Sequence, residues 1–369
     1  MRNGKFMRMA IALARKGIGK TSPNPAVGAV IVKNGRIVGR GYHRKAGLAH
    51  AEINALREAG IKAKGADIYI TLEPCNHFGR TPPCAEAIVR AGIKNIFIGM
   101  KDPNPLVAGK GITRLKNAGI KVETGILEQE CKYINEAYIK YIITKTPFVT
   151  LKLASTLDGK IATASGESKW ITGETARRYA HRMRAEADAV MVGIGTVIAD
   201  DPELTVRLVK GKNPVRIVVD SRLRMPANAK ILNQHKGSVI IATIKKKSQE
   251  SEVRNQEKKI KALNASGADV LLLHSRNGKV DLKALMKELG KREITSLIIE
   301  GGGSLAASAI KEGIVDKITI FVAPKFFGKE GLSMIGELGI RRLKDAICLS
   351  RLECRKLGDD LLLEGYLKP

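Results

Sequence analysis

The chain has 369 residues, of which 44% are hydrophobic and 27% are charged. This length fits two domains of ordinary size, and the composition excludes disordered, collagenous and coiled-coil proteins. Lysine and arginine together number 64 and acidic residues 36, which gives a net charge of +28. Nucleic acid, acidic membranes and small anions are therefore the candidate partners.

The excess of basic residues is spread over the whole chain. Residues 1–146 hold 25 basic and 10 acidic side chains, and residues 147–369 hold 39 and 26. The longest like-charged run is Lys245-Lys246-Lys247, and the glutamates that follow it favour a solvated helix over a nucleic-acid patch. Aromatic residues make up only 4% of the chain, and the stacking platforms that bind single strands need them. We therefore expect small anions as ligands and no binding of nucleic acid.

The sequence carries no sign of a membrane segment. No apolar run approaches the roughly 18 residues of a membrane span, and residues 1–5 lead into an amphipathic stretch without the apolar core of a signal peptide. Five cysteines, an odd number in a long chain, fit reduced thiols and metal ligation better than disulfides. We expect a cytoplasmic homo-oligomer that does not bind membranes.

The first part of the chain alternates short apolar runs with helical patterns. A helix is predicted over residues 5–16, and strands over 27–32 and 36–41 are joined by Asn34-Gly35, which favours a hairpin turn. The remaining predicted elements are helices at 49–59, 84–91, 109–118 and 128–142 and strands at 68–72, 96–99 and 120–123. This order predicts a sheet with helices packed on its faces.

Pro147 marks a domain boundary, because it ends the preceding helix and a new apolar run begins at Phe148. We therefore predict two unlike α/β domains, residues 1–145 and 146–369. In the second domain we predict a strand beginning at 148, helices at 174–187 and 305–311, and strands at 189–192, 215–220, 238–243, 270–273 and 297–300.

A histidine and two cysteines of the first domain form a pattern typical of a catalytic zinc site. His50, Cys75 and Cys84 supply three ligands and leave the fourth tetrahedral position for water. Zinc lowers the pKa of such a water to roughly 7, and Glu52, two residues after the histidine, is placed to carry a proton. Zinc nucleobase deaminases have this order of residues, with about two residues between the cysteines where this chain has eight. Two structural cysteines and a surface histidine are the competing interpretation.

Four motifs of the first domain carry a family resemblance. They are TSPNPAVG at 21–28, GYH at 41–43, HAE at 50–52 and EPCNHFGRTPPC at 73–84. Together they resemble the deaminase half of the RibD family of bifunctional riboflavin biosynthesis proteins, in which the insert between the cysteines also occurs. The resemblance implies a cytidine-deaminase-like three-layer α/β/α domain. It further implies that Asn24 and His43 line the pyrimidine pocket and that His77 and Arg80 reach the substrate from the insert, although Asn24 also fits an ordinary turn residue.

Polar and glycine-rich segments of the second domain lie at predicted strand ends, where open α/β sheets bind their ligands. They span residues 152–159, 168–173, 192–207, 220–221 and 300–304. Together they resemble the reductase half of the RibD family, a domain similar to dihydrofolate reductase that uses NADPH. Thr156 departs from the serine expected in the family and keeps its hydroxyl.

The resemblance implies the following contacts in the second domain. The predicted cofactor residues are Ala154, Trp170, Thr196, Asp200, Ser221, Gly302, Gly303 and Ser304, and the predicted substrate residues are Ser168, Arg184, Leu204, Arg207 and Glu300. Arg184 and Arg207 suit a phosphate ester, since a guanidinium binds it through two hydrogen bonds. An ordinary exposed helical arginine is the alternative at position 184.

These patterns predict a two-step enzyme that uses zinc and NADPH. The first domain would deaminate a phosphoribosylated diaminopyrimidinone, and the second would reduce its ribosyl chain to a ribityl chain, with Asp200 or Glu300 assisting proton delivery and Lys152 as the remaining candidate acid. Two alternatives stay open: a deaminase acting on nucleic acid, and a deaminase whose second domain binds without catalysis.

Overall fold

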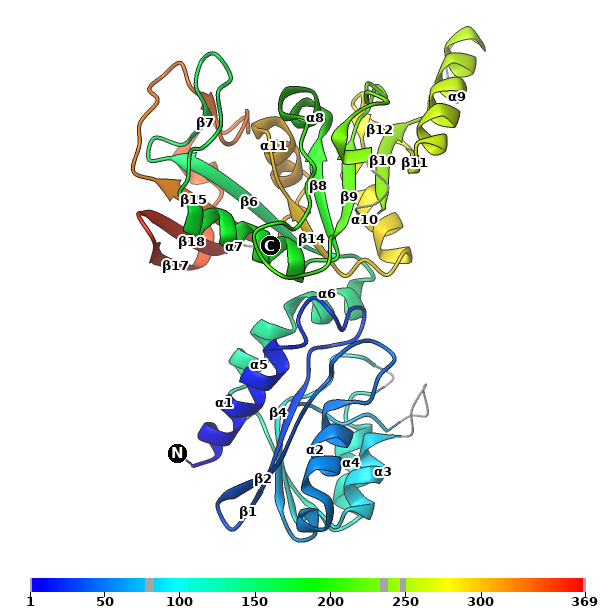
Figure 1. The fold of residues 1–369 in the computed structure, drawn as a ribbon, viewed down its shortest axis with the longest axis vertical. Helices are drawn as coiled ribbons and strands as arrows, with labels where there is room; N and C mark the ends of the chain where they lie inside the picture. Colours follow the sequence, from blue (N-terminus) through cyan, green and yellow to red (C-terminus); the bar gives the residue numbers. More distant parts are fainter. Residues whose placement is uncertain (1, 77–82, 106, 233–237, 246–249, 368–369) are drawn as a thin grey trace. The chain divides into compact units, whose positions relative to one another are not determined.

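The computed structural model describes residues 2–76, 83–105, 107–232, 238–245 and 250–367. The chain forms two compact units, Met1–Lys145 and Thr146–Pro369 (Figure 1). The division falls between Lys145 and Thr146. No helix in the described part of the chain combines the length and apolarity that a membrane span requires.

The first unit is a five-stranded sheet between two helical layers. The strands are β1 (Gly28–Lys33), β2 (Arg36–Tyr42), β3 (Asp67–Leu72), β4 (Asn95–Met100) and β5 (Lys121–Thr124), in the spatial order β2-β1-β3-β4-β5. β1 is antiparallel to β2 and β3, and β3, β4 and β5 are parallel. The helices are α1 (Arg2–Arg15), α2 (Ala51–Ala59), η1 (Gly60–Ala63), α3 (Cys84–Arg90), α4 (Lys110–Asn117), α5 (Glu128–Ile134) and α6 (Glu136–Thr144).

The two helical layers cover opposite faces of this sheet. Figure 1 shows α1 and α5 on one face and α2, α3 and α4 on the other. Glycines let the helices approach closely: a Cβ at Gly28 would lie 2.0 Å from the Ala10 carbonyl oxygen of α1. A Cβ at Gly41 would lie 2.1 Å from the Ala51 carbonyl oxygen at the start of α2. The second of these contacts fixes the position of His50, which immediately precedes α2.

One predicted element of this unit was wrong in detail. The single helix expected over 128–142 is two helices, because Asn135 leaves the helical conformation with φ −120°. Its buried amide instead binds the backbone of Ala26, accepting from the amide nitrogen at 2.8 Å and donating to the carbonyl oxygen at 3.0 Å. A long-range contact therefore interrupts a sequence that is helical by local preference.

The second unit is built on a nine-stranded sheet with the order β11-β10-β9-β8-β14-β6-β15-β18-β17. These strands are β6 (Phe148–Thr156), β8 (Ala189–Gly193), β9 (Val215–Val219), β10 (Val239–Ile244), β11 (Ala268–Leu273), β14 (Ser296–Ile299), β15 (Lys317–Ala323), β17 (Leu349–Leu357) and β18 (Asp360–Leu367). The strands from β11 to β15 are parallel, whereas β18 is antiparallel to β15 and to β17.

Helices cover both faces of the parallel strands. They are α7 (Glu174–Glu186), α8 (Ile194–Asp200), α9 (Glu250–Ala265), α10 (Leu282–Lys291) and α11 (Gly303–Lys311), with short elements η2 (Lys230–Leu232) and η4 (Leu343–Asp345) and small strands β7 (Lys160–Ala162), β12 (Ser275–Arg276), β13 (Lys279–Val280) and β16 (Leu332–Ser333). Side chains of β8 alternate between two cores: Met191 packs in one hydrophobic cluster and Val190 in the other. The predicted α/β fold of two domains is therefore confirmed.

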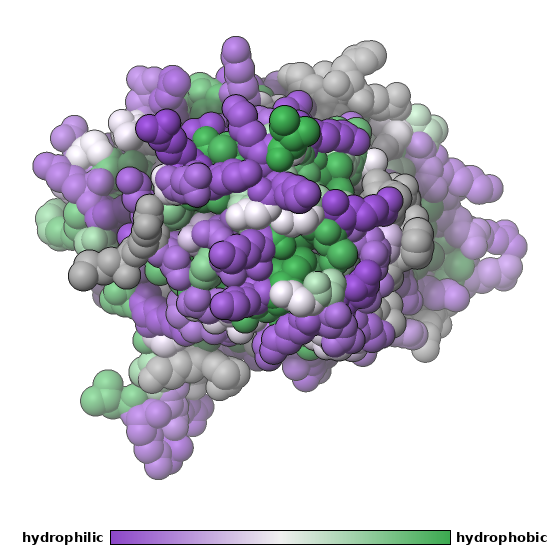
Figure 2. All heavy atoms as spheres, turned by 90° about the horizontal axis from the view of Figure 1, so that it is seen from below, coloured by the Kyte–Doolittle hydropathy of each residue, from purple (hydrophilic) through white to green (hydrophobic). Residues whose placement is uncertain are grey.

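The surface reflects the large charged fraction of the sequence. Figure 2 shows a face on which hydrophilic side chains predominate and hydrophobic ones form smaller groups between them. Among the described residues, buried hydrophobic side chains form one cluster in the first unit, and the two largest clusters of the second lie on opposite sides of its sheet.

Candidate active sites

The predicted metal ligands lie together in the first unit. His50 caps α2, Cys75 follows β3, and Cys84 is the first residue of α3. His50 Nδ1 lies 3.2 Å from Cys84 Sγ and 3.7 Å from Cys75 Sγ, and all three ligand atoms lie within 4.8 Å of one another. The amide nitrogen of Cys84 donates to Cys75 Sγ at 3.4 Å. Hydrogen bonding from the Cys84 thiol lowers the pKa of Cys75, which favours the thiolate that binds metal.

This donor set fits a zinc ion. Two cysteine sulfurs and one imidazole nitrogen are the ligands that zinc prefers, and three protein ligands leave one position for water. Cys84 is buried, while His50 and Cys75 are partly exposed. The interpretation of these residues as two structural cysteines and a surface histidine does not explain why three ligand atoms converge.

Glu52 lies in the first turn of α2, beside the cluster. Its side chain is buried, with an exposed fraction of 3%. Burial raises the pKa of the Glu52 carboxyl to about 7. A carboxyl group with such a pKa exchanges protons readily near neutral pH.

Asn24 and His43 lie next to the metal ligands. Asn24 Nδ2 lies 3.4 Å from His43 Nε2, and the His43 ring meets the His50 ring edge-on at 5.3 Å between centroids. His43 Nδ1 lies 3.3 Å from the Ala49 carbonyl oxygen, a contact that fixes the ring orientation. The other two predicted substrate residues, His77 and Arg80, lie outside the described residues.

Two buried side chains that the sequence analysis missed hold the loops around this site. Asn135 binds Ala26, two residues after Asn24. Glu73 accepts hydrogen bonds from the amides of Asp102, Gly109 and Ile112, all between 3.1 and 3.3 Å. The position of Glu73 was the available sequence signal, because it is an acidic residue at the end of a buried strand and directly precedes Pro74 and Cys75.

In the second unit, predicted cofactor residues gather at the carboxyl ends of the central parallel strands. Thr196 lies in α8, which follows β8, and its hydroxyl accepts from the Gly302 amide at 3.2 Å. Gly301 has φ 102°, and a Cβ there would lie 2.6 Å from Thr196 Oγ1. Glycine is therefore required where the chain turns from β14 into α11. Gly302, Gly303 and Ser304 form the start of α11, whose first amides have no partner within the helix.

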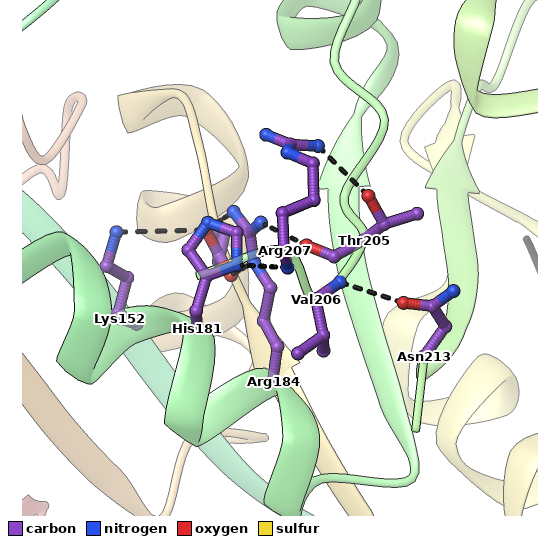
Figure 3. A network of polar contacts seen from close by, with 8 residues as sticks. Lys152, His181, Arg184, Thr205, Val206, Arg207 and Asn213 are labelled. Carbon is purple, nitrogen blue, oxygen red and sulfur yellow. Dashed lines mark hydrogen bonds and ion pairs between the residues drawn. The ribbon is translucent and has the colours of Figure 1, made fainter. Parts of the chain in front are cut away.

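Glu300 follows β14 and is the centre of a buried ion cluster. Arg184 Nε lies 2.7 Å from Glu300 Oε1, Arg184 Nη2 lies 2.9 Å from Oε2, and Lys152 Nζ lies 3.7 Å from Oε2 (Figure 3). The Arg184 side chain is only 13% exposed, so the alternative of an ordinary exposed arginine was wrong. Burial alone would raise the pKa of Glu300, but the charges of Arg184 and Lys152 lower it to about 2. Burial lowers the pKa of Lys152.

The predicted substrate residues Arg207 and Leu204 lie on one irregular segment. Arg184 Nη1 donates to the Thr205 carbonyl oxygen at 3.2 Å, which joins this segment to the ion cluster. Arg207 Nη1 contacts Glu203 Oε2 at 2.9 Å, and the Arg207 side chain is 51% exposed. Leu204 has φ 52° and its side chain is buried in a hydrophobic core.

The remaining predicted residues lie around these strand ends. Ser168 Oγ donates to Asp200 Oδ1 at 3.4 Å, so these two meet. Trp170 is 65% exposed with the Arg177 guanidinium 4.4 Å above its ring. Ala154 lies within β6, and Ser221, two residues after β9, accepts from the Val280 amide at 3.0 Å.

The hydroxyl of Thr156 binds within the protein. It donates to Asp158 Oδ1 at 2.5 Å and accepts from the Lys160 amide at 2.9 Å. A serine could make both hydrogen bonds, so the departure at this position leaves the local structure intact.

The fold and the two clusters indicate a fusion of a zinc-dependent pyrimidine deaminase with a reductase. A family model described as the cytidine and deoxycytidylate deaminase zinc-binding region matches residues 1–100, and the RibD C-terminal domain matches residues 147–363. The chain therefore belongs to the RibD family of riboflavin biosynthesis proteins, as its motifs predicted.

Relatives match this chain over nearly its whole length. It is 49% identical to the riboflavin biosynthesis protein RibD of Aquifex aeolicus, over 97% of this chain and 96% of that protein. The corresponding protein of Escherichia coli is 41% identical, over 98% and 99%. The solved structure of Acinetobacter baumannii RibD has a TM-score of 0.86 at 40% identity, covering 100% of this chain and 99% of that one.

Proposed function

We propose that this chain catalyses two consecutive reactions of riboflavin biosynthesis: deamination of a phosphoribosylated diaminopyrimidinone, and NADPH-dependent reduction of the ribosyl chain of the product. A solved structure from Thermotoga maritima, 36% identical with a TM-score of 0.84, is described as a diaminohydroxyphosphoribosylaminopyrimidine deaminase and 5-amino-6-(5-phosphoribosylamino)uracil reductase. The observation that carries the proposal is the convergence of His50, Cys75 and Cys84 beside Glu52, on the same chain as the Glu300 cluster.

In the deaminase unit, we propose that His50, Cys75 and Cys84 hold zinc and that Glu52 moves the proton. Bound zinc makes a water molecule acidic enough to act as a nucleophile at neutral pH. Glu52 takes a proton from the attacking water and gives it to the amino group that leaves as ammonia. Asn24 and His43 orient the pyrimidine ring through hydrogen bonds to its edge, and His77 and Arg80 complete the substrate site.

In the reductase unit, we propose that the cofactor binds where β8 and β14 end. Ala154, Trp170, Thr196, Asp200, Ser221 and residues 302–304 contact the cofactor, and Ser168, Arg184, Leu204, Arg207 and Glu300 contact the substrate. NADPH supplies a hydride to the C1′ carbon of the sugar. The bond from C1′ to the ring oxygen breaks, and this oxygen takes up a proton and becomes a ribityl hydroxyl.

The proton comes from Lys152 in this proposal rather than from Glu300. Glu300, with a pKa of about 2, is a carboxylate at neutral pH and has no proton to give. Lys152 lies 3.7 Å from it, and burial lowers the pKa of its ammonium, which makes release of a proton easier. Glu300 and Arg184 then serve to hold Lys152 and the substrate in place.

A coupled assay tests the proposal. With the diaminopyrimidinone and NADPH present, ammonia release should precede NADPH oxidation, and the two should reach equal amounts. A chain that releases ammonia but never oxidises NADPH would have a second domain that binds without catalysis. Ammonia release from an oligonucleotide in place of the free nucleotide would indicate a nucleic-acid deaminase.

We further propose that the enzyme is a cytoplasmic homo-oligomer that acts on the free nucleotide and does not bind nucleic acid. The 4% aromatic content supports the choice of the free nucleotide. Light scattering of the purified chain tests the oligomeric state, and mobility-shift titration with single-stranded DNA and RNA at physiological salt tests nucleic-acid binding.

A further inference from the structure

The backbone of Thr205, Val206 and Arg207 is held by three side chains rather than by a helix or strand. The Thr205 carbonyl oxygen accepts from Arg184 Nη1 at 3.2 Å, and the Val206 amide donates to Asn213 Oδ1 at 2.8 Å. The Arg207 amide donates to His181 Nδ1 at 3.0 Å. Figure 3 shows these contacts converging on the segment from its two sides. Such a segment depends on its side-chain partners for its conformation.

His181 joins this segment to the helix that carries Arg184. It lies in α7, three residues before Arg184, and its side chain is buried. Its Nδ1 accepts a hydrogen from an amide, so this nitrogen carries no proton while the contact exists. The charged groups around the ring are Arg184 of α7, Arg207 of the segment, Lys152 of β6 and Glu300 after β14. Burial and the two arginines lower the pKa of His181 to about 4, so the ring is neutral under physiological conditions.

We propose that His181 is a positioning residue of the reductase site: its neutral imidazole fixes the Arg207 backbone and so aims the Arg207 guanidinium at the anionic substrate. This inference rests on the proposed function, in which Arg207 contacts the substrate. Glu203 and the Thr205 hydroxyl hold Nη1 of the guanidinium at 2.9 and 3.0 Å, and His181 holds the main chain of the same residue. The side chain of Arg207 is thus fixed at both ends.

The test compares two substitutions at this position. His181→Leu removes the acceptor, whereas His181→Asn places a carbonyl oxygen close to where Nδ1 lies. We expect His181→Leu to raise the KM for the deaminated substrate about tenfold, because the hydrogen bond from the Arg207 amide is lost and Arg207 is no longer held in place. The KM for NADPH should stay within about twofold of the wild-type value. His181→Asn should recover most of the lost affinity. His274→Leu, at an exposed histidine of the same unit, is the matched control and should change neither KM.

Calorimetric titration of the deaminated substrate into the cofactor-free variants gives a second readout that does not depend on turnover. The inference is overturned if His181→Leu binds substrate as the wild type does, or if His181→Asn loses as much affinity as His181→Leu. It is also overturned if both KM values rise together, because that pattern indicates general damage to the sheet. Failure of the wild type itself to oxidise NADPH with this substrate would overturn the proposed function, and the inference with it.

Discussion

The metal-ligand cluster of the first unit lies at the starts of two helices and the end of a strand, whereas the Glu300 cluster of the second unit lies at the ends of parallel strands. In the first cluster, one imidazole nitrogen and two cysteine sulfurs lie within 4.8 Å of one another, a donor set that suits a zinc ion. In the second, Lys152 and Arg184 surround one carboxylate, so the charges are already compensated within the protein. The first site therefore suits a bound metal ion, whereas the charges of the second site are balanced by the protein's own side chains.

The largest expected effect comes from removing a metal ligand. His50→Ala should abolish stoichiometric zinc and lower deamination by more than about 100-fold, because two thiolates alone hold zinc weakly. Metal analysis by atomic spectroscopy, together with ammonia release, measures the change. Reduction of the deaminated substrate should continue at the wild-type rate, and His274→Ala should behave as wild type. Full zinc content and full deaminase activity in His50→Ala would refute the metal site.

Breaking the compensated cluster should destabilise the second unit. Glu300→Gln leaves Arg184 and Lys152 buried without their counter-charge, at a cost of about 3–5 kcal/mol in the free energy of unfolding. Denaturant unfolding of the chain measures this cost, and reductase activity should fall while zinc content stays. Glu337→Gln, at an exposed acid, provides the control and should leave stability unchanged. If Glu300→Gln and Glu337→Gln were equally stable, Glu300 would not compensate the buried charges of Arg184 and Lys152.

The same cluster predicts a pH dependence of stability. The pKa of Glu300 is about 2 in the folded chain and about 4.3 when unfolded, so its ionisation contributes about 3 kcal/mol above pH 5. Because the folded pKa is the lower one, this contribution is lost as pH falls toward 2, and it should be about half gone at pH 3. The free energies of unfolding of the wild type and of Glu300→Gln, measured at pH 6 and at pH 3, give this contribution. A stability difference that is the same at both values would contradict the prediction.

The smallest effect concerns a loop of the first site. Asn135→Ala removes both hydrogen bonds from the Asn135 side chain to the Ala26 backbone. These two bonds hold the loop that carries Asn24. We expect the KM of deamination to rise about fivefold to tenfold with little change in kcat, since the loop is loosened and the metal ligands stay in place. Steady-state ammonia release tests this. A loss of kcat without a change in KM would show that Asn135 acts on the chemistry instead.

The residue types of the first site indicate its chemistry more directly than those of the second, for a physical reason. Zinc accepts few ligand types, so one histidine and two cysteines indicate a metal site through their residue types. A dinucleotide is held largely by backbone and by small residues, so the proposed cofactor residues Thr196 and Gly302 are suggested only by family motifs. The role of His181 has no local pattern at all, because it binds an amide 26 residues further along the chain.

Two of the elements that the sequence analysis missed, β17 and α9, bury few of their residues, whereas α10 buries Leu282, Leu285, Met286 and Leu289. β17 exposes most of its residues, and in α9 Leu263 is a lone buried residue. β18 pairs antiparallel to β15, although the strands of the same sheet from β11 to β15 are all parallel. The amino-acid composition of β18 does not distinguish it from the parallel strands of the same sheet.

If one chain carries two separate active sites, Glu52→Gln should disable the first site and spare the second. This substitution removes the proton carrier and keeps the shape of the buried side chain, so ammonia release should fall about 10²- to 10⁴-fold. In the same preparation, NADPH oxidation with the deaminated substrate should proceed at the wild-type rate. Undiminished ammonia release, or loss of both activities together in a folded, zinc-containing variant, would contradict the account.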